Sequence, residues 1–63
     1  MIDLGEIKAC MARNGHKQKD IAAILDLSET SVNKKMTGKV PFTVQEVSAL
    51  AKNYDVDINL FIK

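Results

Sequence analysis

Apolar side chains recur at helical spacing along most of the chain. In the first segment, residues 3–13, Leu4, Ile7 and Met11 fall on one face, while the charged residues lie largely outside it. Asn14 and Gly15 follow, and glycine commonly ends a helix. The pattern therefore predicts a first helix over residues 3–13.

Two short helices joined by a tight turn are predicted between Gln18 and Gly38, in the sequence QKDIAAILDLSETSVNKKMTG. Over residues 18–25, one arc of the helix carries Ile21, Ala22, Ile24 and Leu25. Ser28 offers a side-chain oxygen suited to capping the second helix, residues 29–36. Two helices that cross steeply over a short turn need a small residue at their contact, and we expect Ala22 to supply it.

The second helix of this pair is mostly polar. Only Val32 and Met36 are apolar, and their i, i+4 spacing gives a narrow inner stripe. The other residues cover more than half of the helix with hydrogen-bonding groups: Glu29, Thr30, Ser31, Asn33, Lys34 and Lys35. Such a helix is suited to lying in a wet interface.

The pattern after residue 42 predicts two further helices. Thr43 and Glu46 have the spacing of a capping box, and Phe42 and Val47 have the spacing of a hydrophobic staple, so we expect a helix from Thr43 to about Tyr54. Its predicted inward residues are Val44, Val47, Leu50, Ala51 and Tyr54. Asp57 is expected to cap a last short helix, residues 58–62.

The last segment, Ile58 to Ile62, carries four apolar residues in five, more than one face of one helical turn can bury. One interpretation is that Ile58 and Phe61 close the core, with Ile62 as a further candidate, and that Leu60 is incidental. The alternative is that the residue left outside contributes to a homodimer patch.

The length and composition favour one all-α domain over residues 1–63, a compact bundle of about five short helices. The single cysteine, Cys10, excludes an internal disulfide framework and is expected to be a small buried hydrophobe. The acidic N-terminus, MIDLGEIK, is unlike a signal peptide, and the longest apolar run is far below the roughly 20 residues of a membrane span. We therefore expect a cytoplasmic protein without membrane association.

The charge distribution adds a mild asymmetry. Net charge is +1, but residues 16–39 carry five lysines against three acidic residues, so the excess base lies on the proposed helix pair. His16 is expected to be a loop histidine, with phosphate contact as the alternative. A single histidine and a single cysteine cannot supply a metal-ligand set.

We find no nucleophile-base pair, carboxylate dyad or phosphate-cradling glycine loop in the sequence. The sequence therefore predicts neither an enzyme nor a cofactor, and no small-molecule ligand is expected.

The predicted helix pair resembles the helix-turn-helix of the Cro/repressor-type DNA-binding domains, the XRE family with its lambda-repressor-like fold. The resemblance extends over nearly the whole chain, and its matching residues are Gln18, Ile21, Ala22, Leu25, Leu27, Ser28, Val32 and Gly38. The run GKVPFT at residues 38–43 resembles a form frequent in phage-type repressors of this family.

Two positions depart from the family pattern. Asp26 stands where glycine is common, although aspartate tolerates the left-handed backbone better than most residues. Lys17 stands where a threonine or serine usually caps the first helix of the pair, and the missing cap should cost on the order of 1 kcal/mol.

The resemblance implies a transcriptional regulator, similar to a small phage or prophage repressor or Cro-type protein, that binds a double-stranded DNA operator. The polar face of residues 29–36 would enter the major groove, and the predicted base-contacting residues are Glu29, Thr30, Asn33 and Lys34. The predicted phosphate-contacting residues are Lys17, Gln18, Lys19, Ser31, Lys35 and Lys39. One subunit reads too few base pairs to select a genomic site, so we expect a homodimer on a roughly palindromic operator, with half-sites about 34 Å apart.

A second hypothesis is a protein-interaction module, antitoxin-like or partner-docking, that keeps the fold without reading DNA. The near-neutral net charge supports it, as does Glu29, which would repel phosphate from the first turn of its helix.

Overall fold

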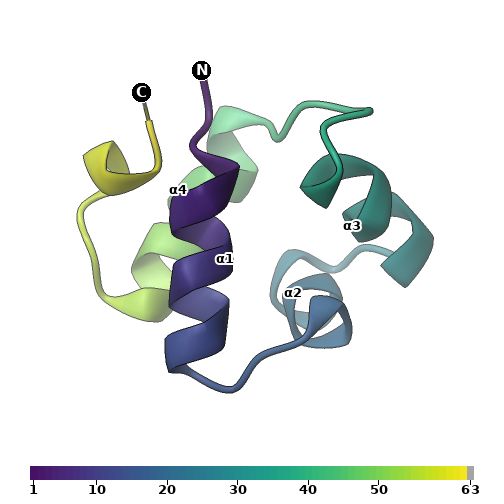
Figure 1. Cartoon of the computed structure of the whole chain (residues 1–63), viewed down its shortest axis with the longest axis horizontal. Coiled ribbons are helices and arrows are strands. Elements are labelled where there is room, and N and C mark those ends of the chain that lie inside the picture. Colours follow the sequence, from purple (N-terminus) through teal and green to yellow (C-terminus); the bar gives the residue numbers. More distant parts are fainter. Residues whose placement is uncertain (63) are drawn as a thin grey trace.

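This computed structural model describes residues 1–62, which contain four α-helices and one 3-10 turn. The helices are α1 (Leu4–Arg13), α2 (Gln18–Leu25), α3 (Glu29–Met36) and α4 (Val44–Tyr54), and the 3-10 turn η1 spans Ile58–Phe61. Figure 1 shows α1 and α4 on one side of the molecule, and α2 and α3 on the other. The all-α bundle and the helix bounds agree with the prediction from the sequence.

Every element contributes to one hydrophobic core. The side chains with no exposed surface are Ile7, Ile21, Val32, Val47, Leu50 and Phe61. The predicted inward faces of α1, α2 and α3 are confirmed, with Cys10 at 1% exposure also part of the cluster. Each helix thus depends on contacts with others, as expected of helices of only 8 to 11 residues.

The first residue of α4 differs from the prediction. Helical periodicity places Val44 on the same face as Val47, yet the Val44 side chain is 73% exposed. Thr43 and Glu46 form the predicted capping box, so the register of the helix is as expected. Periodicity gives the direction of a side chain but not whether another element covers the end of a helix, and the first turn of α4 is left uncovered at Val44.

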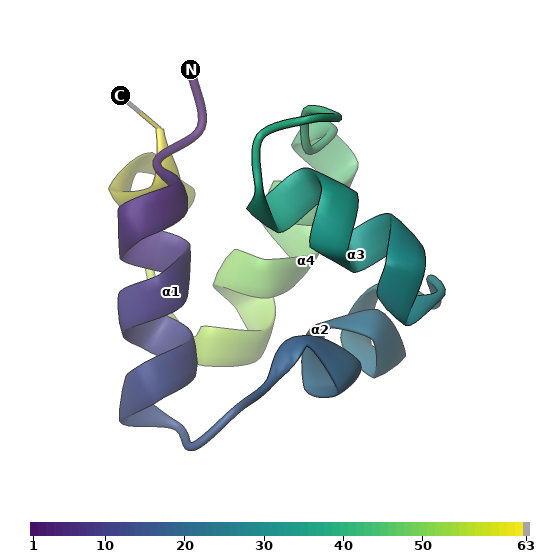
Figure 2. The same cartoon turned by 45° about the vertical axis from the view of Figure 1, so that its right-hand side comes forward.

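The two ends of the chain pair with each other, which the helical pattern did not predict. The Asp3 amide donates to the Phe61 carbonyl at 2.7 Å, and Ile2 and Ile62 form an isolated antiparallel bridge. The ends lie together in both views (Figures 1 and 2). Ile62 is 43% exposed and Leu60 39%, so the predicted core role of Ile62 is wrong, because the extended backbone there leaves its side chain outside.

α4 ends on Asp55, which adopts the left-handed conformation with a φ of 55°. The Val56 amide donates to the Ala51 carbonyl at 3.0 Å and the Asp55 amide to the Lys52 carbonyl at 3.2 Å, so this geometry satisfies the last carbonyls of the helix. Glycine adopts this backbone without the strain of a Cβ atom. The carboxylate is also unfavourable at the negative end of the helix dipole.

Asp55→Gly is therefore expected to stabilise the domain by about 1 kcal/mol. This corresponds to a rise in Tm of about 4–8 °C for a domain of this size, measured by thermal unfolding followed by circular dichroism. The control is Asp57→Ala, which removes the same charge two residues away, where the carboxylate accepts the Asn59 amide at 2.8 Å and caps η1. That control should lower the Tm. An unchanged or lower Tm for Asp55→Gly would show that the left-handed aspartate is not strained.

Candidate nucleic-acid interface

The turn between α2 and α3 is held by local hydrogen bonds. Asp26, which stands where the family commonly has glycine, adopts the left-handed conformation with a φ of 56°. The Leu27 amide donates to the Ala22 carbonyl at 2.9 Å and closes the end of α2. Ser28 Oγ accepts the Ser31 amide at 3.1 Å and caps α3, which confirms its predicted role. Ala22 is 7% exposed, as the expected contact between these two helices requires.

α2 begins without a side-chain cap from Lys17, as predicted. Asp20, three residues later, instead bonds back to Lys17, because its Oδ2 accepts the backbone N–H of Lys17 at 2.8 Å. A carboxylate in the first turn also interacts favourably with the helix dipole. The cost of the missing cap is therefore smaller than the expected loss of about 1 kcal/mol.

α3 presents its polar face to solvent. Val32 and Met36 are 0% and 3% exposed and hold the helix on the core. Figure 2 shows α3 on the outside of the molecule, with α4 behind it and α2 below it. The predicted base-contacting residues are all exposed: Glu29, Thr30, Asn33 and Lys34. This face is therefore not packed beneath other parts of the described chain.

A hydrogen bond links the start of α2 to this face of α3. Asn33 Nδ2 donates to Gln18 Oε1 at 3.3 Å. Asn33 keeps its Oδ1 and its second amide proton for another partner, and Gln18 keeps its own amide donors. A predicted phosphate-contacting residue and a predicted base-contacting residue are thus coupled before any ligand is present.

The other predicted phosphate-contacting residues divide into two groups. Lys17, Lys19 and Lys39 are exposed, and Ser31, whose Oγ accepts from the Ser28 hydroxyl at 3.0 Å, is half-buried at the start of α3. Lys35 differs, because its side chain is only 11% exposed and its Nζ lies 2.9 Å from Glu46 Oε1. Its ammonium group is committed to another part of the protein.

The end of α3 fixes the position of Lys39. Gly38 has a φ of 82°, the left-handed region that favours glycine. Its amide donates to the Lys35 carbonyl at 3.3 Å, and the Lys39 amide donates to the Lys34 carbonyl at 2.9 Å. This pair of bonds is a Schellman motif, which ends the helix and holds Lys39 directly beside its last turn.

His16 has a side-chain partner that the sequence did not predict. His16 Nδ1 lies 2.8 Å from the Tyr54 hydroxyl, and the ring centroids are 5.5 Å apart. Burial raises the pKa of Tyr54, and the nearby negative charge of Asp20 raises it further, so the hydroxyl stays protonated. The pair fastens the connection before α2 to the end of α4. A tyrosine at an inward position of α4 was the available signal, since its hydroxyl needs a polar partner when it is buried.

Residues 1–62 contain neither a candidate metal site nor a candidate membrane span. No group of three or more histidine, cysteine, aspartate or glutamate side chains there is arranged to hold a metal ion. None of the helices in that part of the chain has the length and apolar character needed to cross a membrane.

The four helices form a small domain in which the polar face of α3 is exposed. Small helical domains of this kind are generally associated with helix-turn-helix regulators. The chain belongs to the BetR domain family, whose model matches residues 5–62. No curated protein and no solved structure matches the chain. The family match begins at the second residue of α1 and extends past η1, so it covers the whole of the surface described above.

Proposed function

We propose that this domain is a sequence-specific double-stranded DNA-binding regulator of transcription, a repressor of the small phage or prophage type or a Cro-like protein. The observation that carries the proposal is the exposed polar face of α3, whose two buried residues, Val32 and Met36, pack on the core. The BetR family match supports a regulatory role in DNA binding. We propose no catalytic activity for this domain.

α3 would lie in the major groove, where each base pair presents a distinct pattern of donors and acceptors. Lys34 can donate to guanine O6 and N7, and Thr30 can contact the thymine methyl group. Asn33 can pair with adenine through its free Oδ1 and second amide proton, and the bond to Gln18 would orient it in advance. Glu29 can accept from a cytosine amino group.

Phosphate contacts would fix the register of α3 in the groove. Lys17 and Lys39 flank the helix pair, Lys19 lies in the first turn of α2, and all three are exposed. Gln18 has free amide donors in the same turn. Because one subunit reads only a few base pairs, the proposal includes a homodimer on two half-sites about 34 Å apart.

The test is a titration with duplex DNA at several salt concentrations. With about three to five phosphates neutralised per subunit, log affinity should fall with log salt at a slope of about −3 to −5 per half-site. A duplex selected from a random pool should bind more tightly than the unselected pool. The competing function, a protein-interaction module, is favoured by the exposed Glu29 at the start of α3. It predicts no salt-dependent binding to any duplex.

A further inference from the structure

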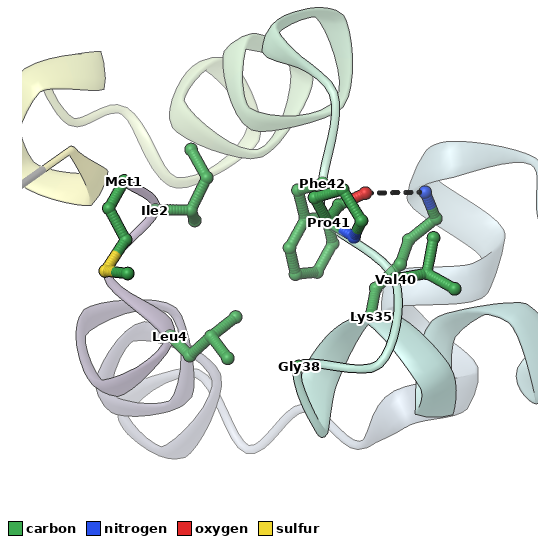
Figure 3. Close-up of a pocket in the computed structure, with 8 residues that line it drawn as sticks. All are labelled: Met1, Ile2, Leu4, Lys35, Gly38, Val40, Pro41 and Phe42. Carbon is green, nitrogen blue, oxygen red and sulfur yellow. Dashed lines mark hydrogen bonds between the residues drawn. The ribbon is translucent and has the colours of Figure 1, made fainter.

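Lys35 connects three parts of the structure. Its Nζ lies 2.9 Å from Glu46 Oε1 on α4, 3.4 Å from the Pro41 carbonyl oxygen, and 5.9 Å from the centre of the Phe42 ring. Figure 3 shows the Lys35 side chain extending from α3 toward Pro41, on one wall of a cavity of about 450 Å³. The last turn of α3, the loop after it and the first turn of α4 therefore meet at one ammonium group.

Glu46 is engaged from both sides. Its Oε1 accepts the Thr43 amide at 2.9 Å, the bond that completes the capping box of α4, in addition to the Lys35 ammonium. Burial alone would raise the pKa of the Glu46 carboxyl, but the bonds from Lys35 and Thr43 outweigh it and hold the pKa below its ordinary value. Glu46 therefore carries its negative charge at neutral pH, 2.9 Å from the Lys35 ammonium nitrogen.

α3 needs a restraint of this kind to hold one orientation. Val32 and Met36 form a narrow stripe, and a helix resting on two side chains is weakly restrained against rotation about that stripe. Lys35 lies beside Lys34, and the carbonyls of both residues accept the amides of the loop that carries Lys39. A tether at Lys35 thus fixes the direction of Lys34 and the position of Lys39 together.

We infer that Lys35 and Glu46 are positioning residues for DNA readout, which hold α3 and the following loop at a set orientation on α4 without touching DNA. This inference rests on the proposed function. It replaces the sequence prediction that Lys35 contacts phosphate. In the free protein, the same ion pair keeps the loop amides of residues 38–40 hydrogen-bonded to the end of α3.

The experiment measures DNA affinity and its salt dependence for three variants that are first shown to be folded by circular dichroism. Lys35→Met keeps the aliphatic stem but loses the charge, Glu46→Gln loses the opposite charge, and Lys35→Arg keeps the ion pair. The first two are expected to bind the selected duplex about tenfold more weakly with an unchanged salt slope, and the double variant should be no weaker than either single variant. Lys35→Arg should bind like the unaltered protein.

The matched control is Lys39→Ala, an exposed lysine beside the same turn. It should weaken binding and reduce the magnitude of the salt slope by about 0.9, the signature of one lost phosphate contact. Glu46→Gln is the sharpest comparison, because removing a negative charge strengthens binding to DNA on simple electrostatic grounds. Weaker binding by this variant therefore supports positioning.

A second measurement uses the free protein and does not depend on DNA. Hydrogen exchange at the amides of Gly38, Lys39 and Val40 should be faster in Lys35→Met and in Glu46→Gln than in the unaltered protein. Unchanged exchange in both variants would overturn the inference. A reduced salt slope for Lys35→Met together with tighter binding by Glu46→Gln would also overturn the inference. The proposed function would still stand in that case. Absence of salt-dependent binding by the unaltered protein would overturn the proposed function itself.

Discussion

Phe61→Ala is expected to lower the free energy of unfolding by about 3–5 kcal/mol, the largest effect on stability predicted for this chain. Phe61 has no exposed surface, and its carbonyl accepts the Asp3 amide, so it joins η1 to the core and the two chain ends to each other. A 63-residue domain at about 0.05–0.15 kcal/mol per residue has only about 3–9 kcal/mol in total. We expect a substantial unfolded fraction at 37 °C, measured by urea titration followed by circular dichroism.

The control is the neighbouring residue. Leu60→Ala alters a side chain that is 39% exposed and should cost well under half as much as Phe61→Ala. Phe61→Leu, which refills most of the volume, should recover a large part of the loss. Equal losses for Leu60→Ala and Phe61→Ala would mean that η1 does not pack on the core through Phe61.

Lys34→Ala is expected to have the largest effect on recognition. Lys34 is exposed on the face of α3 opposite to its buried stripe, and a lysine contact with guanine is worth about 1–3 kcal/mol of discrimination. The variant should lose about 5- to 150-fold of preference at one position of the selected site. Its affinity for unrelated duplexes should change much less. Competition binding with duplexes altered one base pair at a time measures the preference.

Lys52→Ala serves as the matched control, because it makes the same change of charge at an exposed position in the last turn of α4. It should leave the base preference unaltered. If Lys34→Ala instead weakens binding to all duplexes equally, Lys34 contacts phosphate and α3 is turned differently in the groove.

The sequence was sufficient to predict those features that depend on residues close together in the chain, such as helix caps. Ser28 and Thr43 cap their helices as predicted, and Asp26, a residue that tolerates the left-handed backbone, ends α2 without glycine. Caps and left-handed ends depend on residues within one helical turn, so their chemistry is visible in the sequence. The helix bounds followed from these signals, and with them the residues exposed on α3.

The features that the sequence could not show join distant residues. His16 and Tyr54 are 38 positions apart, and Lys35 and Glu46 are 11 apart and in different helices. A lysine on a polar helix is indistinguishable by pattern from its exposed neighbours, so only the fold reveals that Lys35 turns toward α4. The prediction that Val44 faces inward is wrong for a related reason, because no pattern within α4 tells whether another element covers its first turn.

The central claim is that the outward face of α3 contacts base edges in the major groove. Its most direct test is measurement of intermolecular nuclear Overhauser effects between the protein and a selected duplex. The account predicts contacts from the Thr30 methyl group and the Asn33 side-chain amide to thymine methyl groups and other major-groove protons. Contacts arising only from other surfaces, with the resonances of α3 unperturbed by DNA, would contradict it.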